Sequence, residues 1–221
     1  MIASFLLAAA AACSGDCVAQ ESFVTLEQRL DAARSLLVEV DAVCEGAVVC
    51  TLRESLLLAP GGRVRFAVKG TYGGEPVDAL FVSDGKRTRQ TAKGKTIWGK
   101  TPKALHDALF IGFSRMGLTH NSANLSGGRP PDLTDGKIRT TLEAVDFLPL
   151  AQRPGLEIIP FKIFLAGKRA GTGVVWLDGE TGLPVRRYVT VNGPTGELKV
   201  TEDYPLLVLE APWKPADFST K

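Results

Sequence analysis

The side chains best suited to catalysis are few in this sequence and lie far apart. The two histidines, His106 and His120, fall on a predicted helix and at the start of a loop, outside any metal-binding or nucleophile motif. Asp178 and Glu180 are spaced like a carboxylate pair, but they lie in a predicted hairpin turn, where such residues serve the backbone. The sequence has no nucleophile elbow, phosphate-binding loop or zinc-helix motif. We therefore predict a protein that is not an enzyme, without catalytic residues or a cofactor.

An apolar run over residues 2–13 has the length of a signal-peptide core and is too short to span a bilayer. Small residues at the first and third positions before a cut after Ala19 predict a signal peptide over residues 1–19, followed by a single domain over residues 20–221. The protein is then periplasmic. The alternative is that Cys13, which follows three alanines in a degenerate lipobox, anchors an outer-membrane lipoprotein.

The two processing routes leave different numbers of cysteines in the mature protein. Cleavage after Ala19 leaves Cys44 and Cys50 as an even pair, which predicts a disulfide in an oxidising compartment. The lipobox alternative leaves Cys17 unpaired. Five residues separate Cys44 from Cys50, which is not a zinc-ribbon spacing, and no second pair of ligands follows. We predict a disulfide or inert thiols at these positions, and no bound metal.

A run of positive charge is the clearest candidate contact surface. Residues 86–103 contain no acidic side chain and seven basic ones: Lys86, Arg87, Arg89, Lys93, Lys95, Lys100 and Lys103. With Ile97 and Trp98 among them, they suit anionic lipid headgroups or an acidic protein surface, although a solvated hairpin face is the simpler interpretation. The formal net charge of the chain is only +2, and export takes the protein away from nucleic acid, so we predict no nucleic-acid partner.

Two helices are expected to position these side chains. Apolar residues recur every three or four positions from Leu26 to Val40, so we predict an amphipathic helix over residues 26–43. Pro102 and Gly117 bound a second stretch of helical periodicity, in the positions that helix starts and helix ends favour.

The remainder has the pattern of an antiparallel sheet. Short, partly alternating segments are separated by glycine-rich turns, and they cover residues 48–58, 63–72, 77–83, 86–92, 156–166, 171–177, 185–191 and 197–204. Residues 121–135, rich in glycine, proline and serine, are predicted to be a loop. These spacings suit one antiparallel sheet that curls, in a mainly β protein.

Several short motifs, taken in order, resemble the LolA/LolB family of periplasmic lipoprotein carriers and receptors. They are the Ala59-to-Phe66 turn and strand, the Val82-to-Lys86 turn, the helix after Thr101-Pro102 and the Trp176-to-Arg187 hairpin. The resemblance covers most of the mature chain and implies a half-open antiparallel β-barrel covered by a few α-helices. LolA-type carriers have arginine directly before the proline that matches Pro60, and this chain has Ala59 there.

The resemblance also implies what the protein binds. It implies an exported protein that binds acyl chains or lipoproteins and takes part in lipoprotein trafficking to the outer membrane, with membrane association that is peripheral or through a lipid anchor. The alternative is an envelope structural or stress-sensing module that contacts another envelope protein through the curled sheet and carries no lipid.

Five aromatic residues in predicted strands are the candidate lining of an acyl cavity: Phe66, Phe81, Phe161, Phe164 and Trp176. They most simply fill a core. In a half-open barrel the same residues line a cavity, where each buried methylene contributes about 0.8 kcal/mol. The sequence alone leaves both interpretations open.

Overall fold

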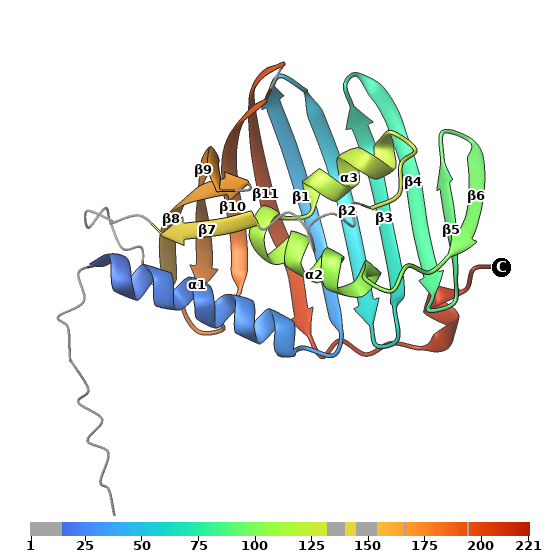
Figure 1. The fold of residues 1–221 in the computed structure, drawn as a ribbon, viewed down its shortest axis with the longest axis horizontal. Helices are drawn as coiled ribbons and strands as arrows, with labels where there is room; N and C mark the ends of the chain where they lie inside the picture. Colours follow the sequence, from blue (N-terminus) through green and yellow to red (C-terminus); the bar gives the residue numbers. More distant parts are fainter. Residues whose placement is uncertain (1–14, 132–139, 145–153, 166, 194) are drawn as a thin grey trace, which may run out of the picture.

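The computed structural model describes residues 15–131, 140–144, 154–165, 167–193 and 195–221. Within them a single curled sheet runs in the order β6-β5-β4-β3-β2-β1-β11-β10-β9-β8-β7, and all neighbouring strands are antiparallel (Figure 1). The strands are β1 (Leu36–Gly46), β2 (Cys50–Ala59), β3 (Arg63–Tyr72), β4 (Glu75–Asp84), β5 (Arg87–Ala92), β6 (Lys95–Lys100), β7 (Thr140–Ala144), β8 (Leu156–Leu165), β9 (Lys168–Asp178), β10 (Pro184–Gly193) and β11 (Gly196–Leu209).

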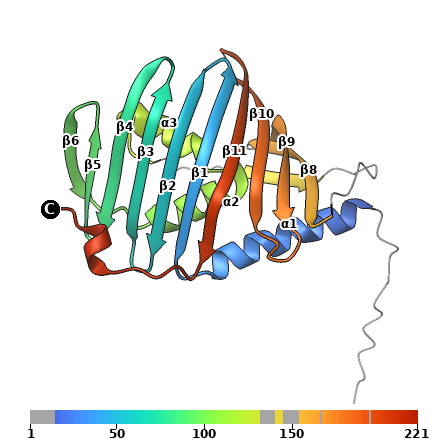
Figure 2. The same ribbon diagram turned by 180° about the vertical axis from the view of Figure 1, so that it is seen from behind.

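The sheet curls but does not close. In the part of the chain that is described, β6 and β7 stand at its two edges and do not pair with each other. Three helices, α1 (Gly15–Ala32), α2 (Leu105–Met116) and α3 (Thr119–Ser126), lie on one side, called here the inner face. Figure 2 shows the opposite, outer face, with the strands in front of the helices. The predicted half-open, helix-covered architecture is confirmed.

Alternation along the strands places apolar side chains on the inner face. Leu56, Phe66 and Phe81 are neighbours across β2, β3 and β4, and all three are buried. At the other end of the sheet, Phe23 of α1 meets Phe161 of β8 edge to face, with ring centroids 5.2 Å apart. The main core therefore lies between the inner face and the helices that cover it.

The C-terminal segment covers part of the outer face. Phe218, in the short 3-10 helix η2 (Pro215–Phe218), packs with Ala59 and Val82 in a second buried cluster. Ala59 has no exposed surface. A longer side chain at this position would therefore have to displace its neighbours in this cluster.

The predicted disulfide is confirmed. Cys44 and Cys50 face each other across the β1–β2 pair, with Cα atoms 4.6 Å apart and both side chains buried. In the chain-entropy model, closing so short a loop stabilises the folded state by about 2 kcal/mol. The alternative lipidation site, Cys13, lies outside the described residues.

The helix predicted over residues 26–43 is wrong at both ends. α1 spans Gly15–Ala32, and its buried side chains include Leu26 and Leu30, but the chain from Leu36 onward is β1. In this segment Val38 and Val40 alternate with acidic residues, and hydrogen bonding to β2 on one side and β11 on the other outweighs the helical spacing.

Of the other elements, the second helix and the predicted strands are confirmed, and β3 matches its predicted bounds. The loop predicted over residues 121–135 is wrong in part, because α3 occupies its beginning, and its residues 132–135 lie outside the described residues. None of the described helices is both long and apolar enough to cross a membrane.

Candidate functional site

An apolar pocket lies at the β6 end of the inner face. Its volume is about 270 Å³, close to the lower limit of small-molecule sites. It is lined by Phe81, Thr88, Gln90, Ile97, Trp98, Gly99, Lys100, Pro102, Leu105, Pro130 and Pro131. The lining is mostly hydrocarbon, which suits an apolar ligand better than a charged one.

Each wall of the pocket comes from a different element. The floor is a row of cross-strand neighbours, Phe81 of β4, Gln90 of β5 and Ile97 of β6. Leu105, in the first turn of α2, forms one side. The Gln90 side-chain amide donates to the Arg129 carbonyl oxygen over 2.9 Å, which holds the two prolines that follow α3 above the floor.

Backbone and side-chain hydrogen bonds both hold the segment that leads from β6 into α2. The Thr101 amide donates to the Lys86 carbonyl oxygen at 3.0 Å, and the Thr101 and Ser83 hydroxyls lie 2.7 Å apart. Ser83 also donates to the Gly62 carbonyl oxygen at 2.7 Å. The start of α2 is therefore fixed to the sheet, so this side of the pocket is preformed.

The pocket opens beside two exposed apolar side chains. Ile97 and Trp98 are 57% and 56% exposed, on a strand whose six residues are all exposed. Ile97 pairs with Gln90 and so projects from the inner face, whereas Trp98 pairs with Arg89 and projects from the outer face. A ligand that enters here passes the edge of the sheet.

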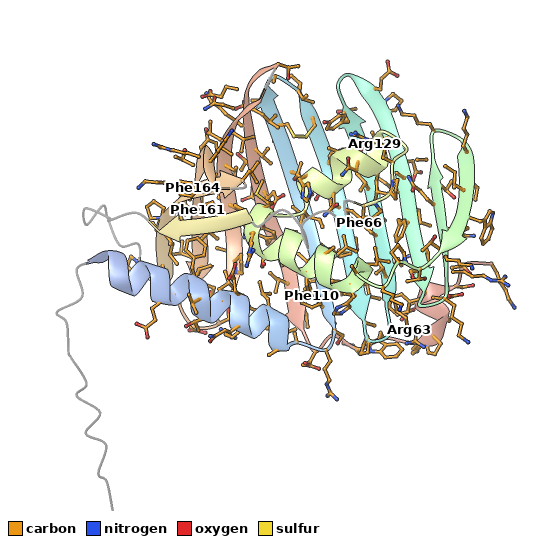
Figure 3. The ribbon with its side chains drawn as sticks, viewed as in Figure 1. Arg63, Phe66, Phe110, Arg129, Phe161 and Phe164 are labelled. Atoms are coloured by element: carbon orange, nitrogen blue, oxygen red, sulfur yellow. A yellow bond between two sulfur atoms is a disulfide. The ribbon has the colours of Figure 1, made fainter. Side chains whose placement is uncertain are left out.

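Three of the five predicted cavity aromatics, Phe66, Phe81 and Phe161, lie on the inner face. Figure 3 labels Phe66 and Phe161. Phe66 and Phe161 are buried in the main core, at 0% and 1% exposure, under side chains of the helices. Phe81 borders the pocket. Phe66 is thus next to the pocket floor but buried in the core, and the pocket itself begins at its cross-strand neighbour Phe81.

Phe164 and Trp176, which the sequence grouped with these three, lie on the outer face. Trp176 is opposite Arg186 of β10, whereas the adjacent Val175 is opposite the inward Arg187. The Arg186 guanidinium lies over the Trp176 ring, 6.0 Å from its centroid. Phe164 follows the inward Ile163 and so points outward. Neither residue therefore lies on the inner face.

Buried charges that the sequence reasoning missed hold the corner between α2 and α3. Glu202 of β11 is 1% exposed, and its carboxylate accepts the Leu118 and Thr119 amides at 2.8 and 2.7 Å and the Tyr204 hydroxyl. Gly117 ends α2 with a φ of +78°, and a Cβ there would overlap the Glu202 carboxylate. The carboxylate thus compensates the positive end of the α3 dipole.

Arg187 performs the complementary role at the end of α2. It lies opposite Glu202 in the β10–β11 pair and is 1% exposed. Its guanidinium donates to the Ser114 and Phe113 carbonyl oxygens, at 2.9 and 3.3 Å. A cation stabilises the negative end of a helix dipole, so this cross-strand pair fixes the end of one helix and the start of the next.

Glu54 of β2 is the third buried ionisable residue, and it has fewer stabilising contacts than Glu202 or Arg187. It is 3% exposed, and neither carboxyl oxygen has a hydrogen-bond partner of ordinary geometry. Burial raises its pKa well above the usual value, the charge of Glu202 raises it further, and the nearby Ser122 and Thr119 hydroxyls only partly offset this. The sequence signals this buried group, because Glu54 stands between Leu52 and Leu56 in the alternation that places side chains on the inner face.

A second hollow, of about 530 Å³, lies at the turns below α2. Its lining is Arg34, Pro60, Gly61, Gly62, Gly85, Thr101, Pro102, Lys103 and His106. Proline is its largest apolar side chain, so it suits an acyl chain poorly. Arg34 at its rim pairs with Glu210 over 3.5 Å.

The residues first considered for chemistry are separated in the fold. His106 lies on α2, where its ring contacts Phe110, and His120 lies on α3. The Asp178 carboxylate accepts the Thr181 and Glu180 amides and serves the β9–β10 turn, as predicted. Within the described ranges, no group of three histidine, cysteine or acidic side chains is placed to hold a metal ion.

Comparison with protein-family models and with curated protein sequences gave no match. Among solved structures, the chain is similar to MucB, at 14% identity and a TM-score of 0.40 over 95% of this chain and 65% of MucB, so it spans less than two thirds of that protein. It is also similar to the Mycobacterium tuberculosis lipoprotein LppX, at 14% identity and a TM-score of 0.40 over 86% of this chain and 96% of LppX. A LolA superfamily protein from Nitrosomonas europaea has 10% identity and a TM-score of 0.40, over 91% of this chain and 97% of that protein.

Proposed function

We propose that this protein is a non-enzymatic binding protein that takes up a single acyl chain, of a lipid or a lipidated protein, in the pocket at the β6 end of the inner face. The observation that carries the proposal is the open apolar pocket between Phe81, Leu105 and Ile97. Removing a methylene group from water contributes about 0.8 kcal/mol, so even a short stretch of chain gains affinity there.

Ile97→Asp should weaken binding of a fluorescent fatty acid by about tenfold or more, because the bound chain would desolvate a carboxylate in the pocket wall. Ile97 is exposed before the ligand enters, so the substitution leaves the core intact. Affinity for competing fatty acids should rise by about fourfold per methylene until the pocket is full. Titration of the probe, followed by displacement, measures both effects.

Thr96→Asp is the matched control, since it adds the same charge to the same strand outside the pocket lining. It should bind the probe as the wild type does. If the folded wild type shows no saturable binding of the probe, or if both variants lose it equally, the acyl-binding proposal fails.

The second candidate is a module that contacts another envelope protein through the curled sheet. The observation that favours it is the extent to which the inner face is occupied, with Phe23, Phe66 and Phe161 all buried in one core. Failure of the probe to bind would make this candidate the better account.

We further propose that residues 1–19 are removed on export, so that the mature periplasmic protein begins at Gln20. The cut would shorten α1 and leave its buried residues Phe23, Leu26 and Leu30 in place. The intact mass of the protein from an envelope fraction should match a start at Gln20. A diacylglyceryl mass on Cys13 would instead show the lipoprotein route, and a retained Met1 would contradict both.

A further inference from the structure

We propose that the β5–β6 hairpin docks the protein onto an anionic lipid bilayer, with the free edge of β6 lying along the headgroups. Within the described residues β6 pairs with β5 alone, so its other edge is unpartnered. Docking does not depend on the proposed acyl binding, and the two are measured separately below.

Positive charge surrounds this edge. Lys93 and Lys95 lie at the tip of the hairpin and Lys100 at its other end, and all three are exposed. The acidic residue that immediately precedes the run, Asp84, is engaged by the β4–β5 turn. Its carboxylate accepts the Arg87 and Lys86 amides, each at 2.8 Å, and the Arg87 amide does most to lower its pKa. Exposed lysines at such an edge complement the negative surface of anionic lipids.

The apolar side chains on β6 distinguish a bilayer from a purely ionic partner. Because Ile97 and Trp98 project from opposite faces of the strand, only contact along the edge covers both at once. Tryptophan favours the boundary between headgroups and acyl chains, where its ring is buried and its N–H stays hydrated. A purely ionic partner would contact the lysines but would leave both half-exposed apolar side chains uncovered.

The placement of the pocket is consistent with this docking. Ile97 and Trp98 belong to the pocket lining as well as to the edge. A bilayer along β6 therefore meets the mouth of the pocket, and an acyl chain could pass between them without crossing water.

The test is sedimentation with vesicles of phosphatidylcholine and phosphatidylglycerol, compared with vesicles of phosphatidylcholine alone. The double variant Lys93→Glu, Lys95→Glu alters the hairpin tip without touching the pocket lining. Its affinity for the anionic vesicles should fall by at least about tenfold. Its matched control, Lys168→Glu with Arg169→Glu, makes the same charge change at exposed residues where β9 begins and should keep most of the binding.

Trp98 reports the contact directly. With Trp176→Phe and Trp213→Phe, fluorescence comes from Trp98, and its emission should shift to shorter wavelength with the anionic vesicles. Three results would overturn the proposal. The first is no vesicle binding by the folded wild type, which would assign the edge to an acidic protein or a second copy. The others are equal losses of binding in the two charge-reversal variants, and vesicle binding without a shift in Trp98 emission. A wild type that binds the anionic vesicles but not the fatty-acid probe would leave docking standing and would contradict the acyl-binding proposal.

Discussion

Arg187→Met should lower the free energy of unfolding by about 3 kcal/mol or more, the largest loss that we expect from one substitution in this protein. The variant removes the cation that faces Glu202 across β10 and β11 and leaves that carboxylate buried. It also removes the donors to two carbonyl oxygens at the end of α2. Chemical denaturation at neutral pH measures the change.

The neighbouring Arg186 is the matched control. It lies on the outer face, where its side chain is 51% exposed and pairs with Asp203 over 3.5 Å. Exposed ion pairs contribute little, so Arg186→Met should cost about 1 kcal/mol or less. Adding Glu202→Gln to Arg187→Met should recover part of the loss, since the amide oxygen still accepts the α3 amides without a buried charge. Equal losses for Arg186→Met and Arg187→Met would contradict this account.

Most of the sheet, β2 to β5 and β8 to β11, could be predicted from the sequence because its signals are local, whereas β1, β6 and β7 were not predicted. Alternating residues between glycine-rich turns mark strands, and β3 has the predicted bounds. β1 could not be separated from a helix in the same way, because Val40 fits both the helical spacing from Leu37 and the strand alternation with Val38. Only pairing with β2 and with β11, from the far end of the chain, decides the outcome.

α3 shows how a distant contact fixes a segment of weak local preference. Its sequence contains mostly asparagine, serine and threonine, which favour turns over helix interiors. Its first amides are held by Glu202, 84 positions away from Leu118 in the chain. No local pattern signals such a partner, so a loop was predicted there.

The residues that line the pocket lie far apart in the sequence, so their grouping could not be predicted from it. Phe81 borders the pocket, whereas the other lining residues come from β5, β6, the start of α2 and the prolines after α3. Trp176 and Phe164 lie on the outer face, which the sequence does not reveal, because the face on which a strand residue lies depends on register and a shift of one residue reverses it. Register is set by pairing between strands, which composition does not encode.

Glu54→Met should raise the free energy of unfolding by about 1 to 3 kcal/mol at mildly alkaline pH, because it replaces a buried carboxyl group without hydrogen-bond partners by an apolar side chain of similar length. The effect should depend on pH. Burial and the Glu202 charge raise the pKa of Glu54 in the folded state, so the folded protein binds this proton more tightly than the unfolded chain does. Wild-type stability should therefore fall as the pH rises above the ordinary value of 4.5 toward the raised pKa.

Glu54→Met lacks the titrating carboxyl group, so its free energy of unfolding should not show this fall. The difference in stability between the variant and the wild type should therefore grow as the pH is raised. Glu54→Gln should flatten the profile in the same way with a smaller gain, since it removes the charge but keeps a buried polar group. Glu39→Met, at an exposed position of the adjacent β1, is the matched control and should retain the wild-type slope. Urea denaturation of the four proteins across a pH series provides the comparison. An unchanged slope in Glu54→Met, or a gain that does not vary with pH, would mean that Glu54 stays in one protonation state under α3 throughout the range.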